Sequence, residues 1–349
     1  MVTKLKKTAA FTDIHWGAKS NSDQHNQDCL NFIDWFCEQV QGDPTIDHIM
    51  FLGDWFENRS AINVATLNWS HRGAKKINDL NLPVYFVIGN HDLYHRHTRE
   101  LFSTIGFSEF KNFHIVNEPI IVPEIANGVL ISPFLFPEEY PSLVKYSNID
   151  TWWGHFEFKG FVVTGYNIVM PTGPDPKDFA GPKHIVSGHF HKRQAQRNVV
   201  YMGNTFPTNF GDAGDNNRGM MVYDHTINKM EFINWDQCPK YTKTTVSDLL
   251  DNKIKLFPES RIKCIVDVPV TYEEVSALKQ GFVDSFSLRE FSMEESQSLS
   301  DVLSGTETTV EGDGKLDNVD DLVVQMLNEI DNDHIDNNIL IEEYRRIRV

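Results

Sequence analysis

Residues 84–92 have the sequence VYFVIGNHD, in which five apolar residues lead into a polar end. The run from Val84 to Ile88 is β-branched, aromatic or aliphatic throughout, and this composition predicts a buried strand. Gly89 allows a sharp turn after the strand, because it has no Cβ to clash with neighbouring backbone. Asn90 and the residues after it then lie at the carboxyl end of that strand, where open α/β sheets place their ligand sites.

Four further segments repeat this pattern of an apolar run followed by polar residues. They are FTDIHWG at 11–17, FLGDWFE at 51–57, WGHFEFKGF at 153–161 and SGHFH at 187–191. Polar residues at several strand ends predict one shared site at the edge of a sheet. The candidate metal ligands among them are Asp13, His15, Asp54, Asn90, His155, His189 and His191.

These residue types indicate which metals the site would hold. Carboxylate oxygens and neutral imidazoles suit borderline-hard divalent ions such as Mn²⁺, Fe²⁺ or Zn²⁺. Seven candidates are too many for one tetrahedral ion, and they fit two ions that share one carboxylate. Two ions about 3.5–4 Å apart can activate a water and clamp a phosphate. Taken singly, each motif also has an ordinary reading as a helix cap, a turn or a surface pair, so the prediction depends on the whole set.

The spacing of apolar residues predicts an α/β fold. Gln27–Val40 and Ala65–Leu80 show helical patterns between strands at Thr8–Phe11, Ile49–Leu52 and 84–88, and this alternation favours a largely parallel sheet. The later short apolar runs predict a second sheet and hence a sandwich flanked by helices. These runs are Gly128–Ile131, Thr151–Trp153, His184–Val186, Val199–Met202, Met220–Tyr223 and Met230–Ile233.

Composition divides the chain into four parts. Residues 1–240 form the predicted main domain, and residues 241–295 a small α+β unit with a strand at Lys263–Val268, a helix at Tyr272–Lys279 and a strand at Ser285–Phe291. Residues 296–316 are rich in Ser, Thr, Gly and acid, which predicts a linker. Residues 317–349 carry an apolar stripe with helical spacing, which predicts C-terminal helices. The stripe comprises Val319, Leu322, Val323, Met326, Leu327 and Ile330.

The charge of the chain is unevenly distributed. The 349 residues carry a formal net charge of −17, which argues against a simple basic DNA coat. Residues 294–349 hold 15 acidic and 4 basic residues, a net −11, which leaves −6 for the first 293 residues. The acidity therefore belongs mostly to the C-terminal sixth, and it points to a protein partner without excluding DNA.

Several other function classes are disfavoured. Cys29, Cys37, Cys238 and Cys264 form no CxxC pair, which argues against a disulfide scaffold or structural zinc site. The N-terminus lacks the apolar core of a secretory signal, and no run approaches 18 apolar residues. We therefore expect a cytoplasmic protein without membrane contact (in the host cytoplasm, for a phage-encoded chain).

The five motifs resemble those of the calcineurin-like metallophosphoesterase superfamily, and within it the SbcD-type DNA double-strand-break repair nucleases. VIGNHD and SGHFH match the family pattern, and FTDIHWG and FLGDWFE resemble its first two motifs. WGHFEFKGF is similar to the corresponding segment of T-even phage recombination nucleases. YMGNTFPTNFGD, at 201–212, resembles the segment that closes the nuclease domain. GDWFENR lacks the second Asp and the Arg-Gly of the protein-phosphatase motif, which disfavours that branch.

The resemblance implies a role for each matching residue. Asp13, His15 and His191 would bind one metal, Asn90, His155 and His189 the other, and Asp54 would bridge the two. His91 would act as the general acid toward the leaving 3′ oxygen, and Asp92 would orient its ring. Glu57 stands where eukaryotic and archaeal relatives often have a second active-site His. It is read here as a loop acid or as a residue that supports a metal ligand.

As a whole, the resemblance implies a Mn²⁺-dependent nuclease (with Mg²⁺ as the alternative ion) that is a 3′→5′ exonuclease on duplex DNA and an endonuclease on single strands. Residues 241–295 would cap the DNA. Residues 317–349 would dock on an SbcC-like, SMC-type ATPase, in a complex with two copies of each chain. Two alternatives stay open: a small-substrate or cyclic-nucleotide phosphodiesterase, and a non-catalytic scaffold.

Basic residues near the motifs are candidates for DNA contact, since phosphate binding depends on Lys and Arg. A solvated basic surface is the alternative for each cluster. The candidates are Arg72, Lys75 and Lys76 after the second motif, Arg96 and Arg99 after the third, and Lys192, Arg193 and Arg197 after the last.

Overall fold

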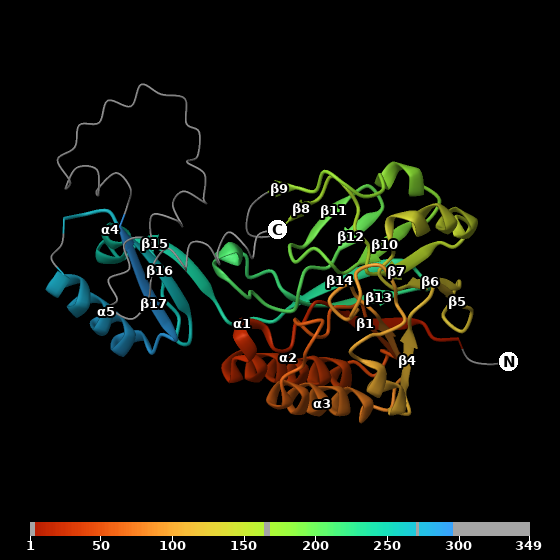
Figure 1. The fold of residues 1–349 in the computed structure, drawn as a ribbon, viewed down its shortest axis with the longest axis horizontal. Helices are drawn as coiled ribbons and strands as arrows, with labels where there is room; N and C mark the ends of the chain where they lie inside the picture. Colours follow the sequence, from red (N-terminus) through yellow and green to blue (C-terminus); the bar gives the residue numbers. More distant parts are fainter. Residues whose placement is uncertain (1–3, 164–167, 270–271, 296–349) are drawn as a thin grey trace, which may run out of the picture. The chain divides into compact units, whose positions relative to one another are not determined.

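The computed structural model of the chain describes residues 4–163, 168–269 and 272–295 (Figure 1). The helices are α1 (Ala18–Asn21), α2 (Asp23–Gly42), α3 (Val64–Asn78), α4 (Val246–Leu250) and α5 (Tyr272–Phe286). The strands are β1 (Lys7–Phe11), β2 (His48–Phe51), β3 (Val84–Val87), β4 (Phe113–Val116), β5 (Ile120–Val122), β6 (Val129–Ser132), β7 (Thr151–Gly154), β8 (Val162–Val163), β9 (Ile168–Val169), β10 (His184–Ser187), β11 (Gln194–Gln196), β12 (Val199–Tyr201), β13 (Gly219–Asp224), β14 (Lys229–Asn234), β15 (Tyr241–Thr245), β16 (Arg261–Val266) and β17 (Glu290–Glu295).

The first large sheet has the strand order β14-β13-β1-β2-β3-β4, and β1 to β4 run parallel. Side chains alternate between the two faces of a strand, and here both faces are covered. Phe11 and Phe51 pack with residues of α2 in one core cluster, whereas Ala10 and Met50 belong to a second cluster between the sheets. Burial on both faces explains why these strands are continuously apolar.

The second large sheet has the order β11-β12-β10-β7-β6-β5, with β6, β7, β10 and β12 parallel. Trp153 and Val186 face inward, into the same cluster as Met50, so the two sheets share one core. Trp152 and Ile185 face outward and pack against Tyr140 and other aromatic residues. The fold is the predicted α/β sandwich flanked by helices.

The helices α2 and α3 cover the outer face of the first sheet (Figure 1). The side chain of Ser22 caps the start of α2 by accepting a hydrogen bond from the backbone N–H of His25. The side chain of Asn63 caps α3 in the same way, by accepting the backbone N–H of Ala65. Such caps satisfy N–H groups that have no partner within a helix. No helix of the described residues is long and apolar enough to cross a membrane.

Residues 241–295 contain a separate parallel sheet, β15-β16-β17, with its own core around Ile262, Cys264 and Phe291. The sequence analysis missed β15 and placed the last strand too early. The sequence predicts a helix that ends at Lys279 and a strand at Ser285–Phe291. However, α5 extends to Phe286 and β17 begins only at Glu290, since Phe282 and Phe286 stack along one helix face.

Candidate metal centre

The metal-ligand candidates meet where the parallel strands of both sheets end. Asp13 and His15 follow β1, Asp54 follows β2, and Asn90 follows β3, the neighbouring strands of the first sheet. His155 follows β7, and the residues His189 and His191 follow β10, the neighbours in the second sheet. The sandwich thus converts a set spread over 179 positions of the sequence into one cluster.

The backbone at this edge adopts conformations that L residues seldom occupy. Asp13, His15 and Asp54 have φ between 52° and 59°, and His189 has φ 88°. Strained residues of this kind persist where the surrounding structure holds them, and they concentrate at functional sites. Gly53 has φ 97°, and a Cβ there would lie 2.5 Å from His155 Nδ1, so the residue before Asp54 has to be glycine.

The first group of ligand atoms comes from Asp13, His15 and His191, whose donor atoms lie within 4.8 Å of one another. The Nε2 atoms of His15 and His191 face each other at 3.0 Å. Asp13 Oδ1 lies 3.8 Å from His191 Nε2 and 3.9 Å from His15 Nε2. Asp13 is fully buried and also accepts the backbone N–H of His189.

The second group comes from Asp54, His155 and His189. Asn90 joins it through Oδ1, which lies 2.9 Å from both His155 Nε2 and His189 Nδ1. Asp54 connects the two groups, because its Oδ2 is 3.4 Å from His155 Nε2 and 3.9 Å from His15 Nε2. One oxygen of Asp54 therefore lies within reach of both groups.

The opposite nitrogen of each of three imidazoles is engaged by a partner. His155 Nδ1 donates to the Leu52 carbonyl oxygen at 2.7 Å. His15 Nδ1 lies 2.8 Å from Glu57 Oε2, and His189 Nε2 lies 3.1 Å from Glu157 Oε2. Such partners select the tautomer whose free nitrogen points into the centre, as in carboxylate–histidine–metal arrangements.

Of these two carboxylates, only Glu57 was noted from sequence. Glu157 was missed, and its only signal is its position two residues after His155 in an extended segment. Residues two apart in extended backbone lie on one face, so an acid at this spacing can reach the same region.

The buried carboxylates and imidazoles of the centre shift one another's pKa values. Burial favours the neutral acid at Asp54, but the adjacent His155 holds the pKa of that carboxyl well below its usual range. Burial also disfavours charge on His155, yet the charge of Asp54 raises the pKa of the imidazole to about 9. The pKa of His15 is likewise raised to about 9, against its burial, by the hydrogen bond to Glu57.

The donor set fits two divalent cations. It offers carboxylate and amide oxygens together with imidazole nitrogens, the ligands that borderline-hard ions prefer. In the described part of the chain, neither Asp13 nor Asp54 forms an ion pair with Lys or Arg. Two buried carboxylates without such a partner are stabilised by bound cations.

His91 lies beside the centre, and its surroundings differ from those expected. Its ring meets that of His15 edge-on, with 4.9 Å between centroids, and its Nδ1 donates to the Glu57 carbonyl oxygen at 2.8 Å. Asp92 was expected to orient this ring. Its carboxylate instead accepts the backbone N–H groups of Gly89, Asp54, Trp55 and Phe56, at 3.0 to 3.3 Å. Asp92 thus holds the loops that carry Asn90 and Asp54.

Some of the basic residues near the motifs contact other residues of the protein, whereas others have no ion pair in the described part of the chain. Lys75 pairs with Asp79 and Lys76 with Asp34, both at 2.6 Å, while Arg72 lies over the Trp69 ring. Arg99 pairs with Glu139, and Arg193 donates to Met202 O and Asn234 Oδ1. Within the described ranges, Arg96, Lys192 and Arg197 have no ion pair, and all three are exposed. DNA contact by these residues stays a prediction.

Arg59 was missed by the sequence analysis. It lines a hollow of about 450 Å³ together with His91, Glu57 and Arg96. Among the described residues it has no ion-pair partner, and the nearby Arg96 and partial burial lower its pKa. The predicted docking stripe, from Val319 to Ile330, lies outside the described residues.

This chain is similar to a protein-family model, to one curated protein and, more distantly, to solved structures. The family model described as calcineurin-like phosphoesterase matches residues 6–193. Exonuclease subunit 1 of Enterobacteria phage T4 is 28% identical over 187 residues, so the match spans 52% of this chain and only about half (54%) of that relative.

Two solved structures are more distant. A novel archaeal phosphodiesterase has a TM-score of 0.38 and 12% identity over 66% of this chain and 99% of its own. A dimetal phosphatase from Danio rerio has a TM-score of 0.40 and 8% identity over 63% and 93%. The family match covers more than half of the chain and every ligand candidate, and it confirms the family that the motifs predicted: the chain belongs to the calcineurin-like phosphoesterase family.

Proposed function

We propose that this chain is a two-metal DNA nuclease, active with Mn²⁺ and with Mg²⁺ as the alternative. It would act as a 3′→5′ exonuclease on duplex DNA and as an endonuclease on single strands. The observation that carries the proposal is the position of Asp54 Oδ2, within 4 Å of an imidazole from each ligand group, with His91 beside it. The name of the phage relative, an exonuclease subunit, supports DNA as the substrate.

Each ligand group would hold one cation. Asp13, His15 and His191 would bind the first and Asn90, His155 and His189 the second, with Asp54 between them. When bound, two such cations activate a water and offset charge on the non-bridging phosphate oxygens. Glu57 and Glu157 would keep the ring of His15 and that of His189 in the required tautomer.

His91 would supply the proton for the leaving group. Because its Nδ1 donates to the Glu57 carbonyl oxygen, the other ring nitrogen, Nε2, is left to face substrate. Protonated at Nε2, the ring would donate to the departing 3′ oxygen, a general-acid step worth about 10²–10⁴-fold in rate. Asp92 would be a positioning residue for the loops after β2 and β3.

Arg59 and Arg96 support a polyanionic substrate. Both side chains line the hollow beside His91, and neither has an acidic partner in the described part of the chain. Burial, and to a smaller extent the charge of Arg96, lowers the pKa of Arg59, so the charged guanidinium is destabilised there. A backbone phosphate next to the scissile one would neutralise both.

The experiment is cleavage of end-labelled duplex and single-stranded DNA by the purified chain with Mn²⁺. His91→Ala should lower kcat by about 10²-fold or more while Mn²⁺ binding is kept, because general-acid catalysis contributes that much. His114→Ala, an exposed histidine on the edge strand β4, is the matched control. An inert wild type, or a His91→Ala variant as active as wild type, would contradict the mechanism. Hydrolysis of cyclic nucleotides without DNA cleavage would instead indicate a small-substrate phosphodiesterase.

For the remainder of the chain, we propose that residues 1–240 form the nuclease domain and residues 241–295 a DNA-capping domain. Residues 296–316 would be the linker, and 317–349 would dock on an SbcC-like, SMC-type ATPase in a recombination and repair complex with two copies of each chain. The separate core of β15, β16 and β17 supports the division at residue 240.

A further inference from the structure

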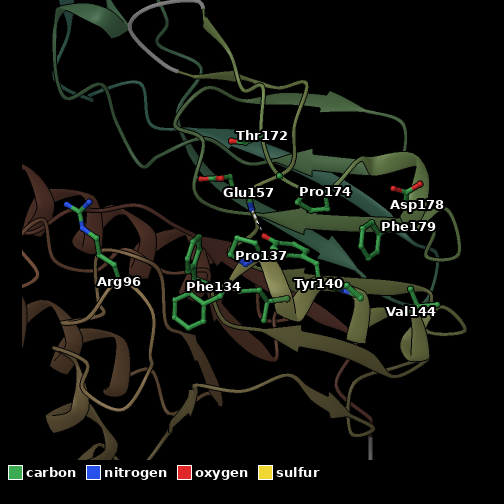
Figure 2. Close-up of a pocket in the computed structure, with 14 residues that line it drawn as sticks. Arg96, Phe134, Pro137, Tyr140, Val144, Glu157, Thr172, Pro174, Asp178 and Phe179 are labelled. Atoms are coloured by element: carbon green, nitrogen blue, oxygen red, sulfur yellow. Dashed lines mark hydrogen bonds between the residues drawn. The ribbon is translucent and has the colours of Figure 1, made fainter.

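A large aromatic pocket lies next to the metal centre (Figure 2). Its volume is about 680 Å³, within the range of about 300–1,000 Å³ typical of pockets that take small organic groups. Aromatic residues and prolines form half of its wall. They are Phe134, Phe136, Tyr140 and Phe179 together with Pro137, Pro141 and Pro174.

The pocket adjoins a cavity that contains two of the ligand candidates. A smaller cavity of about 290 Å³, which contains Asn90 and His189, shares Arg96, Phe134 and Glu157 with it. The Phe134 ring lies 5.9 Å from the ring of His189 and 6.2 Å from that of His155, between centroids. A group attached to a phosphate at the ligand cluster would therefore lie beside the aromatic wall.

The charges around the pocket favour a neutral occupant over a phosphate. Glu157 and Asp178 contribute carboxylates to the wall, and Arg96 is the cation at the end nearest Phe134 (Figure 2). Glu157 uses Oε2 to contact His189, while its other oxygen has no partner in the described residues. A free carboxylate oxygen accepts the exocyclic amino groups of adenine, cytosine or guanine. A phosphate is favoured only near Arg96.

The wall is held in place by hydrogen bonds, so the pocket is preformed. Phe134 donates its N–H to the Ile88 carbonyl oxygen at 2.8 Å, which ties the wall to the end of β3. Arg99 Nη1 donates to the Phe134 carbonyl at 3.0 Å and to Glu139 Oε2 at 2.7 Å. The Tyr140 hydroxyl accepts the backbone N–H of Glu157 at 2.9 Å, the dashed line in Figure 2.

We infer that this pocket holds one unstacked nucleobase of the strand being cut, with Arg96 on its backbone phosphate. The inference rests on the proposed nuclease function and narrows its substrate to DNA with an unpaired nucleotide beside the scissile bond. Aromatic side chains bind bases of any sequence by stacking, because every base has a π-face. A duplex end must then fray before it is cut, which selects termini and single strands over intact duplex.

The test couples a change in the protein to a change in the DNA. Single-stranded oligonucleotides with phosphorothioate linkages, which resist hydrolysis, carry one abasic site at each position in turn. Binding to wild type should fall by about 10-fold at one fixed position, in keeping with the worth of one stacked base. 2-Aminopurine placed at that position should change its fluorescence on binding, because the signal reports its stacking partners.

Phe134→Leu keeps an apolar side chain but removes the stacking face, so it should bind the intact oligonucleotide about 10-fold more weakly and lose the abasic effect. Phe110 is a half-buried phenylalanine on the far side of the first sheet, and Phe110→Leu should retain the abasic effect. An equal loss by Phe134→Leu on intact and abasic DNA would overturn the inference, because it would indicate a general disturbance of the centre. The inference would also be overturned if wild type cleaved ordinary DNA but no position of the abasic site weakened its binding. That result would leave the nuclease proposal intact.

Discussion

At the scale of single residues, the centre depends on glycines as well as on the ligand candidates, because a Cβ at these glycines would clash with neighbouring loops. A Cβ at Gly89 would lie 2.2 Å from Asp54 Oδ1 and 2.3 Å from its backbone N. A Cβ at Gly188 would lie 2.2 Å from Thr12 Oγ1. Because glycine has no Cβ, the loops after β2, β3 and β10 can pack closely against one another. A Cβ at Gly89 would clash with the backbone N of Asp54, and a side-chain rotamer change cannot relieve such a clash.

Gly89→Ala should therefore weaken the centre by displacing Asp54. We expect Mn²⁺ affinity, measured by isothermal titration calorimetry, to fall by about 5- to 150-fold, since overpacking costs about 1–3 kcal/mol. Gly106→Ala has nothing within 4 Å of the added carbon and is the matched control. Wild-type affinity in the Gly89→Ala variant would show that Asp54 does not need this approach.

At the scale of elements, a buried polar chain links β1, β2 and the end of β13. Thr8 Oγ1 lies 2.6 Å from His48 Nε2 and 2.7 Å from His225 Nε2. His48 Nδ1 lies 2.7 Å from Asp47 Oδ1, and a carboxylate accepts, so His48 Nε2 must accept from Thr8. His225 then donates through Nε2, and its Nδ1 has no hydrogen-bond partner among the described residues. Protonation of His48 would make its Nε2 a second donor toward Thr8, and protonation of His225 would place a charged N–H group at its unpartnered, buried Nδ1, so both histidines are neutral here.

Stability should therefore fall in mild acid. Burial lowers the pKa of His225 to about 3 and also lowers that of His48. The unfolded chain takes up these protons near pH 6.5, so the free energy of unfolding falls as the pH drops from about 6.5 toward 3, by up to about 1.4 kcal/mol per pH unit for His225, and His48 contributes in the same direction.

His225→Gln keeps a donor toward Thr8 but does not titrate, so urea unfolding should depend less on pH between 4 and 6.5. His114→Gln, an exposed histidine, should retain the wild-type dependence. The network assignment fails if His225→Gln and wild type have the same slope.

At the scale of the whole molecule, the small unit of residues 241–295 is attached to the main domain through charge. Arg289 donates to both carboxylate oxygens of Asp28 on α2, at 2.8 and 2.7 Å. Asp28 is buried, and Arg261 adds a contact to Gln24 on the same helix at 3.0 Å. Both bonds come from Arg289 Nη1, and hydrogen bonds between ionised groups are stronger than those between neutral groups.

Arg289→Met should destabilise the protein by about 3 kcal/mol, because it leaves the Asp28 carboxylate buried without a partner. The measurement is the urea unfolding midpoint, and adding Asp28→Asn should recover part of the loss. Lys253→Met breaks an exposed pair with Asp248 and Asp251, and it should leave the unfolding midpoint close to that of wild type. Equal effects of the two single variants would argue against a buried contact.

Removal of residues 317–349 should separate docking from chemistry. The truncated chain should no longer co-purify with a co-expressed SbcC-like ATPase, because the apolar stripe would be the docking surface. Its Mn²⁺-dependent nuclease activity should persist, since every ligand candidate precedes residue 192. Retention of the ATPase by the truncated chain would refute the docking proposal.

The sequence by itself determined the family, the sandwich, and the ligand candidates with their glycines, because short-range patterns at strand ends specify them. VIGNHD and SGHFH carry both strand and turn chemistry within six residues, so no distant contact is needed to recognise them.

Only the tertiary structure shows which of these side chains lie in contact, and at what distance. Strand order places one oxygen of Asp54 between two groups drawn from two sheets, and it directs Asp92 to backbone N–H groups instead of the His91 ring. Glu157, Arg59 and the pocket around Phe134 likewise emerge only from packing. The physical reason is that hydrogen bonds and electrostatic interactions depend on distances of a few ångströms, and folding sets these between residues far apart in the chain.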